Sequence, residues 1–138
     1  MSKLKCIMLV DDDEATNFLN KLIISEAVND VHIRGLQTAY AALDSLRKRE
    51  ICEKSGHFII PDLILLDLNM PGVNGWEFLE EFKQLDNDIT AKTKIIILTS
   101  SINPEDIEKS RKITELSGYL SKPLTESMVI KIVEEHFK

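Results

Sequence analysis

The sequence predicts an α/β protein with a five-stranded parallel sheet and helices on both faces of that sheet. The first observation behind this prediction is that apolar runs alternate five times with segments of helical period along the 138 residues. The second is that two of the runs, Leu63–Leu66 and Ile95–Leu98, are apolar throughout, which is typical of parallel strands buried on both faces. Five βα units in succession imply a single parallel sheet covered on either side.

The elements follow one another at regular intervals. We expect strands at residues 5–10, 31–36, 62–67, 94–99 and 118–121. We expect helices at residues 14–27, 38–52, 75–85, 104–116 and 125–137. Apolar residues at helical spacing mark the first helix: Phe18, Leu19, Leu22 and Ile23. The same spacing marks the third helix: Phe78, Leu79, Phe82 and Leu85.

Capping signals place the starts of the last two helices. Asn103 precedes Pro104, which suits an N-cap followed by proline at the first helical position, and Thr125 is a plausible cap for the last helix. The helix at 104–116 has few apolar positions and many charges, so we expect it to be weakly held. Two long connections, 50–60 and 86–93, carry no recognisable chemistry and are interpreted as surface elaboration.

The composition is that of a soluble globular protein. A hydrophobic content of 43% and a length of 138 residues fit one domain, residues 1–138. The net charge of −6 disfavours nonspecific binding to nucleic acid or an anionic membrane. No apolar run approaches a membrane span and the N-terminus is no signal peptide. Cys6 and Cys52 show no metal-binding or redox spacing, so we expect a reducing, cytoplasmic location.

Functional groups follow four of the five expected strands. Asp11 and Asp12 follow the first, Asp67 the third, Thr99 ends the fourth and Lys122 follows the fifth. Because parallel strands end at one edge of the sheet, these groups should converge there. Adjacent carboxylates need a cation, and oxygen ligands at an open surface suit Mg²⁺. Asp67 can then attack phosphorus, with Thr99 and Lys122 contacting the phosphoryl oxygens.

Four motifs in this order resemble the receiver domain of two-component response regulators, over essentially the whole chain. They are Leu9–Asp12, Asp67–Gly72, Thr99–Ser100 and Gly118–Pro123. The resemblance implies the flavodoxin-like (βα)5 receiver fold, and its nearest form is a stand-alone receiver like the chemotaxis regulators. In such a protein the domain signals as a phosphoacceptor and is not an enzyme acting on other substrates.

The resemblance also assigns roles by position. Asp67 is the phosphorylated residue, and the metal ligands are Asp12, Asp11 (often through water), Asp67 and the backbone carbonyl of Asn69. Thr99 and Tyr119 form the switch. Lys122 binds the phosphoryl group, and its peptide bond to Pro123 is cis in the family. Asn69 and Ser101 flank the site and are expected to tune the lifetime of the phosphoryl group.

The partners implied are a sensor histidine kinase or a histidine phosphotransfer protein, and a protein target that the sequence does not identify. No output domain, helix-turn-helix or basic stripe is visible, so we expect no direct contact with nucleic acid or membrane. Phosphorylation is expected to change the face made by 104–116, 118–121 and 125–137, through which a homodimer is possible.

Other interpretations of the same residues remain open. Asp13 and Glu14 are expected to serve only the helix dipole, and Asp11 and Asp12 could be mere N-cap acids. An aspartyl-nucleophile phosphatase of the haloacid-dehalogenase type would need an Asp-x-Asp motif, which Asp11 and Asp13 match poorly. A phosphorylation-independent binding module and a flavodoxin-like cofactor-binding protein are further alternatives. Steady turnover of a phosphate ester would indicate the phosphatase, and flavin absorbance would indicate the cofactor-binding protein.

Overall fold

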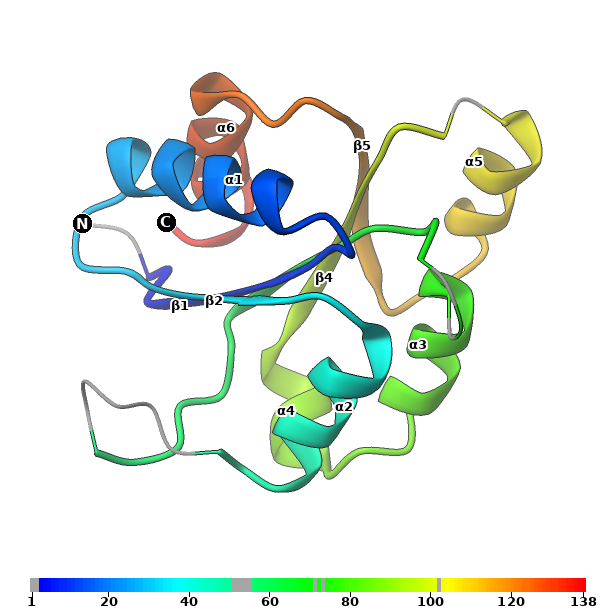
Figure 1. Cartoon of the computed structure of the whole chain (residues 1–138), viewed down its shortest axis with the longest axis horizontal. Helices are drawn as coiled ribbons and strands as arrows, with labels where there is room; N and C mark the ends of the chain where they lie inside the picture. Colours follow the sequence, from blue (N-terminus) through cyan, green and yellow to red (C-terminus); the bar gives the residue numbers. More distant parts are fainter. Residues whose placement is uncertain (1–2, 51–55, 71, 73, 102) are drawn as a thin grey trace.

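The computed structural model describes residues 3–50, 56–70, 72, 74–101 and 103–138. It contains one parallel sheet with strand order β2-β1-β3-β4-β5 (Figure 1). The strands are β1 (Cys6–Val10), β2 (His32–Leu36), β3 (Leu63–Leu66), β4 (Lys94–Thr99) and β5 (Leu116–Ser121). The helices are α1 (Glu14–Ala27), α2 (Ala39–Arg47), α3 (Gly75–Phe82), α4 (Asn87–Lys92), α5 (Pro104–Arg111) and α6 (Glu126–His136). The predicted fold class is confirmed.

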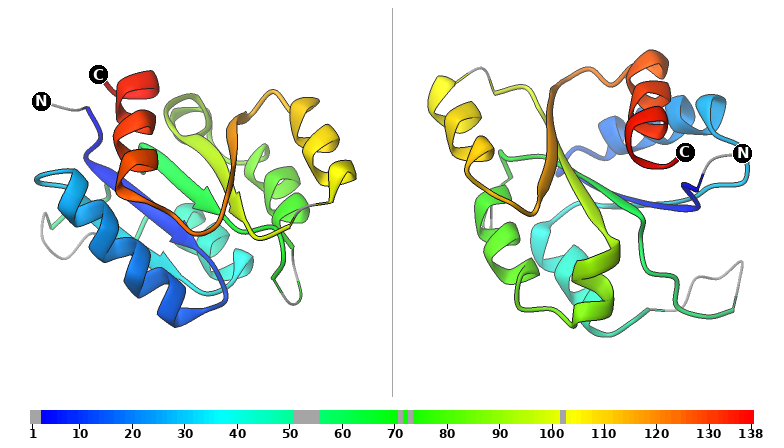
Figure 2. Two further views of the ribbon diagram at one scale, coloured as in Figure 1. Left: turned by 90° about the horizontal axis from the view of Figure 1, so that it is seen from above. Right: turned by 180° about the vertical axis from the view of Figure 1, so that it is seen from behind.

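The sheet separates two hydrophobic cores, with α1 and α6 over one face and α2, α3, α4 and α5 on the other (Figures 1 and 2). Because successive side chains of a strand point to opposite faces, each central strand contributes to both cores. On β3, for example, Leu63 and Leu65 pack towards α1 and α6, whereas Ile64 and Leu66 pack towards α2 and α3. All four are buried, as the continuous apolar run predicts.

Three of the four apolar residues that mark the period of α1 are exposed: Phe18, Leu19 and Leu22. Phe18 is 62% exposed and Leu19 57% exposed, whereas Asn17, Asn20 and Ile24 are buried. The rotation of the helix follows from Asn17, whose Nδ2 donates hydrogen bonds to the carbonyls of Asp11 (3.0 Å) and Leu36 (3.3 Å). These polar contacts and the packing of Ile24 determine the buried face, while the bounds predicted for this helix, residues 14–27, agree with those of α1.

Helix α2 ends earlier than the predicted 38–52. Arg49 has φ +50°, its N–H donates to the carbonyl of Leu46, and the N–H of Glu50 donates to that of Ser45. This is a Schellman-type end built without glycine, so no stop signal is visible in the sequence. The predicted residues 51–52, which include Cys52, lie outside the described residues, as does the rest of the segment 51–55 of the first long connection.

The second long connection contains a helix that the sequence analysis missed. Helix α4 buries Ile89 beneath α2 and α3, and Arg49 pairs with Asp86 (3.1 Å) and Asp88 (2.8 Å) at its start. A six-residue helix with one buried side chain is too short to show a helical period in the sequence.

In the last part of the chain both predicted N-caps are correct, whereas the bounds predicted for α5 and β5 differ from the observed ones. Asn103 and Thr125 accept backbone hydrogen bonds as N-caps of α5 and α6, which confirms both. The helix predicted at 104–116 ends at Arg111, and β5 begins at Leu116 rather than at residue 118. Among the described residues, no helix has both the length and the apolar character needed to cross a membrane.

Candidate functional site

Backbone hydrogen bonds extend the sheet by one residue at its carboxyl edge. The N–H of Asp11 donates to the carbonyl of Leu36 (3.0 Å), and that of Asp67 donates to the carbonyl of Val10 (3.0 Å). The N–H of Lys122 donates in the same way to the carbonyl of Thr99 (2.9 Å). The backbone at each of these positions is therefore held by the sheet while its side chain leaves the edge. Asp11 and Asp67 lie where the neighbouring strands β1 and β3 end. The strand order reverses between these two strands, and α/β proteins bind their ligands at such a point.

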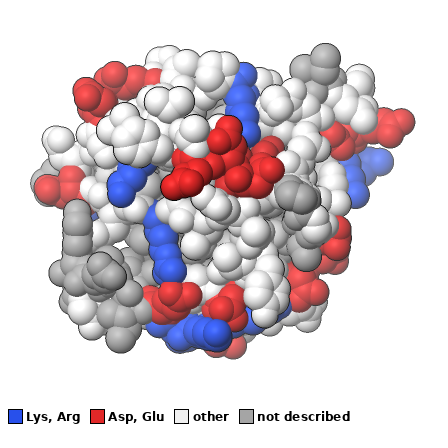
Figure 3. All heavy atoms as spheres, viewed as in Figure 1, with Lys and Arg blue, Asp and Glu red and all other residues white. Residues whose placement is uncertain are grey.

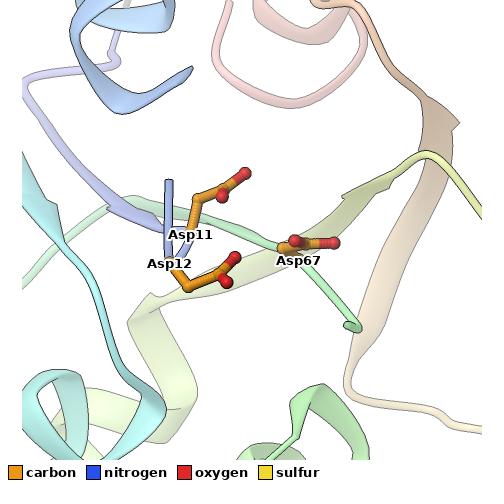
Figure 4. A group of neighbouring side chains, drawn as sticks. All are labelled: Asp11, Asp12 and Asp67. Carbon is orange, nitrogen blue, oxygen red and sulfur yellow. The ribbon is translucent and has the colours of Figure 1, made fainter. Parts of the chain in front are cut away.

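Three carboxylates meet at this edge. Asp11 and Asp12 come from the end of β1 and Asp67 from the end of β3, and one oxygen of each lies within 4.8 Å of the others (Figure 4). Asp11 and Asp67 are buried, with 5% exposure each, whereas Asp12 is exposed. Acidic side chains gather on the surface above this edge of β1 (Figure 3). A donor set made only of oxygens, with one side open, is suited to a hard divalent cation.

The Lys122 ammonium lies between two of these carboxylates. Its Nζ donates to Asp11 Oδ2 (2.5 Å) and contacts Asp67 Oδ2 (3.3 Å). Burial disfavours the charged ammonium, but the hydrogen bond with Asp11 and the charge of Asp67 outweigh this effect and raise the pKa of Lys122. The lysine is thus positively charged at neutral pH. The peptide bond between Lys122 and Pro123 is cis.

The two buried carboxylates are also oriented by backbone amides. Asp11 Oδ1 accepts from the N–H of Asp13 (2.9 Å), and Asp67 Oδ1 accepts a long hydrogen bond from the N–H of Asn69 (3.4 Å). Each carboxylate therefore has one oxygen facing an amide and one facing the ammonium of Lys122. This arrangement fixes the orientation of the Asp67 carboxylate at the open edge of the sheet.

Asp13 lies beside this cluster but serves the helix. It is the N-cap of α1, where its side chain accepts from the N–H of Ala15 (3.0 Å) and the hydroxyl of Thr16 (2.9 Å). The hydrogen bond from Thr16 is the main cause of the lowered pKa of Asp13. The N-cap acid is thus Asp13, and the alternative that Asp11 and Asp12 are only cap acids does not apply to α1.

The predicted switch residues lie on the next two strands of the sheet, Thr99 on β4 and Tyr119 on β5. Thr99 is fully buried, and its Oγ1 accepts a hydrogen bond from the N–H of Ser101 (3.2 Å). The Tyr119 side chain is half-buried, and its hydroxyl donates to the carbonyl of Ser101 (3.4 Å). Thr99 and Tyr119 therefore contact the same residue, although nothing in the sequence pattern singles out Ser101 as their common neighbour.

Gly75 is a residue of the site that the sequence analysis missed. It is the first residue of α3, and a Cβ placed there would lie 2.8 Å from the carbonyl oxygen of Asp67 and 2.9 Å from Cα of Leu68. Its N–H donates to the carbonyl of Leu68 (3.1 Å). The start of α3 thus supports the backbone of Asp67 directly. The sequence signal was a glycine immediately after an N-cap asparagine, Asn74.

Comparison with known proteins gives a consistent result over nearly the whole chain. The family model of the response regulator receiver domain matches residues 7–134. Response regulator Rcp1 from Synechocystis sp. is 32% identical over 130 residues, which cover 94% of this chain and 84% of that protein.

Solved structures agree with this match. The crystal structure of a two-component response regulator from Cytophaga hutchinsonii is similar with a TM-score of 0.82 at 32% identity, and the match covers 96% of each chain. The Mn²⁺-bound form of response regulator Rcp1 is similar with a TM-score of 0.69 at 30% identity, covering 95% of this chain and 90% of that one.

Proposed function

The chain belongs to the response regulator receiver family of two-component signalling, and we propose that Asp67 is its phosphoacceptor. The observation that carries the proposal is the position of the Asp67 carboxylate. It lies at the open edge of the sheet, 3.3 Å from the Lys122 ammonium and beside the carboxylates of Asp11 and Asp12. A nucleophilic carboxylate beside a fixed cation and a cation-binding pair is the donor set that phosphoryl transfer to an aspartate requires.

In the proposed reaction an oxygen of Asp67 attacks the phosphorus of a phosphohistidine on a partner protein. The P–N bond breaks, its electron pair stays on the imidazole nitrogen, and an acyl phosphate forms on Asp67. Lys122, already positioned beside Asp67, then neutralises one phosphoryl oxygen, and the hydroxyl of Thr99 hydrogen-bonds another. The N–H of Ser101 occupies a lone pair of Thr99 Oγ1, which leaves the hydroxyl proton of Thr99 available to donate.

We propose Mg²⁺ as the cation, held by Asp11, Asp12 and Asp67 with the backbone carbonyl of Asn69. The three carboxylates fit a divalent cation, and a relative of similar structure, Rcp1, is known in a Mn²⁺-bound form. When bound, the metal would counter the negative charge of the phosphoryl group and of the clustered carboxylates. Both ions prefer oxygen ligands, so the Mn²⁺-bound relative supports a divalent site without choosing between them.

Receiver domains interact with histidine kinases or histidine phosphotransfer proteins, and we propose such a donor for this chain. We further propose that the signal leaves through protein contact, on the face made by α5, β5 and α6, with either a target protein or a second copy of the chain. In this proposal Thr99 and Tyr119 are the switch, and turnover is limited to the protein's own phosphorylation and dephosphorylation.

The test is intact-mass spectrometry after incubation with acetyl phosphate and Mg²⁺. We expect a labile phosphoryl adduct on the wild type and on Asp13→Asn, which keeps the cap of α1, but none on Asp67→Asn. Omitting Mg²⁺ or adding EDTA should prevent the adduct. An adduct that persists in Asp67→Asn would reject Asp67 as the phosphoacceptor. Steady release of phosphate from a small ester would instead favour a phosphatase.

A further inference from the structure

Helix α5 is attached to the rest of the protein mainly by polar contacts. Among its described residues only Ser110 is buried, and the helix lies beside α3 at one side of the sheet (Figures 1 and 2). A helix without an extensive apolar face gains little from packing and can move at small cost. Its position should therefore depend on the few side chains that tie it to its neighbours.

One of these ties leads directly to the switch threonine. Ser101 Oγ donates a hydrogen bond to Asp106 Oδ2 (2.7 Å), in the first turn of α5. The N–H of Ser101 donates to Thr99 Oγ1 (3.2 Å), and its carbonyl accepts from the Tyr119 hydroxyl (3.4 Å). Ser101 thus uses its amide, its carbonyl and its hydroxyl to join Thr99, Tyr119 and α5.

The charge of the Asp106 carboxylate also acts on Tyr119. Burial raises the pKa of the Tyr119 hydroxyl, and the negative charge of Asp106 adds to this effect. The same carboxylate accepts the hydrogen bond of the Ser101 hydroxyl. By contrast, Glu105 is exposed on the same turn, and it contributes its backbone N–H to the cap formed by Asn103.

We propose that the hydrogen bond between Ser101 and Asp106 is the link through which a movement of Thr99 displaces α5, so that Asp106 is a positioning residue of the switch. The proposal rests on the function proposed above and adds its route of transmission. If Thr99 turns towards a phosphoryl group while keeping its contact with the Ser101 amide, the segment after β4 moves with it. Because Asp106 is bound to the Ser101 hydroxyl, the start of α5 moves too. The two ends of the link are thus Thr99 and α5, and each must bias the other.

The chain carries its own reporter for this movement. Trp76 is the only tryptophan, it lies on α3, and the ammonium of Lys109 on α5 is 4.7 Å from the centre of its ring. A displacement of α5 relative to α3 removes this cation from the indole, which changes the fluorescence of Trp76. The variant Lys109→Met defines the emission expected when the cation is absent.

The experiment measures Trp76 emission in Ser101→Ala, Asp106→Ala and the double variant, before and after labelling with acetyl phosphate and Mg²⁺. Glu105→Ala is the matched control, because it removes the same charge from the same turn. Asp106→Asn is the conservative variant, because its side-chain oxygen can still accept from Ser101. Intact mass gives the extent of labelling in every sample.

Two results are expected. Before labelling, Ser101→Ala and Asp106→Ala both shift the emission towards that of Lys109→Met, since both remove the bond between Ser101 and Asp106. Ser101→Ala also removes the 3.4 Å contact from the Asn103 N–H, so the double variant shifts the emission no further than Ser101→Ala does. After labelling, the wild type, Glu105→Ala and Asp106→Asn show a further change. In Ser101→Ala and Asp106→Ala this change is smaller by about three-fold or more, although Asp67 is still labelled.

The link is overturned if either single variant behaves like Glu105→Ala, or if the effects of Ser101→Ala and Asp106→Ala add in the double variant. It is also overturned if Ser101→Ala alone changes the response, because Ser101 would then act at the site directly. Absence of any adduct on the wild type refutes the proposed function instead. The comparison before labelling still tests the link in that case.

Discussion

Adding one methyl group at Gly75 should displace the backbone that carries Asp67. In Gly75→Ala the new Cβ would lie 2.8 Å from the Asp67 carbonyl oxygen, 2.9 Å from Leu68 Cα and 3.0 Å from Leu68 Cδ2. Two of these three atoms belong to the backbone, which cannot rotate away as a side chain can. The start of α3 or the loop after β3 must therefore move by roughly 0.5–1 Å to restore normal contact distances.

The expected cost follows from this geometry. Overpacking a well-packed site costs about 1–3 kcal/mol in the free energy of unfolding. Replacing glycine by alanine also restricts the unfolded chain, which returns about 0.4–1 kcal/mol. We therefore expect Gly75→Ala to be destabilised by about 1–2 kcal/mol. Because the displaced atoms belong to Asp67 and Leu68, labelling of Asp67 by acetyl phosphate should slow by about ten-fold or more.

Gly118→Ala is the matched control for this change. A Cβ at Gly118 would lie 3.6 Å from the nearest atoms, both in the side chain of Ile96, which is ordinary contact. Urea unfolding should show a midpoint lower by about 0.5–1 M for Gly75→Ala and nearly unchanged for Gly118→Ala. Equal midpoints for the two variants, or a wild-type labelling rate in Gly75→Ala, would refute the claim that the start of α3 supports Asp67.

Three further changes test other parts of the structure. Asp12→Ala should weaken Mg²⁺ binding by about ten-fold or more in a calorimetric titration, whereas an equal loss in Asp13→Ala would contradict the assignment of the cluster. Asp62→Ala should lower the free energy of unfolding by about 2–3 kcal/mol in thermal melts, because two amides at the start of β1 donate to its carboxylate. Asp62→Asn keeps an acceptor and should lose less, so equal losses would count against this explanation. The lowered pKa of Asp13, due chiefly to its hydrogen bond from Thr16, implies stability that is present above the ordinary value of 3.8 and lost as the pH falls through the lowered pKa. The stability difference between wild type and Asp13→Ala should therefore be constant from neutral pH to about pH 5 and shrink below about pH 4, and a difference that grows in acid would contradict it.

The positions of the residues at the strand ends could be predicted because this prediction depends on few assumptions. A strand that is apolar throughout and ends on Asp67 must deliver that carboxylate to the carboxyl edge of a parallel sheet. The same holds for Asp11 and Asp12, and the structure brings these three carboxylates together. The family match over residues 7–134 confirms the resemblance predicted from the four motifs.

The predictions failed where a local pattern competes with tertiary contacts. The bounds of α1 were predicted correctly, but its apolar spacing does not show which side is buried: Phe18 and Leu19 are exposed, because the hydrogen bonds of Asn17 orient another side of the helix towards the sheet. The end of α2 was missed because Arg49 adopts a left-handed conformation that usually belongs to glycine. Helix α4 was missed because its single buried residue, Ile89, contributes no period.

The sequence by itself therefore determined the order of the βα units and the chemical groups at the open edge of the sheet. Hydrophobic period and residue type are local properties, and parallel strands bring their carboxyl ends together whatever the details of packing. Only the tertiary structure decided which side of α1 is buried, that Gly75 supports Asp67, and that Ser101 joins Thr99 to Asp106. These contacts depend on distances between elements and on the rotation of helices, and both are settled by the packing of the whole molecule.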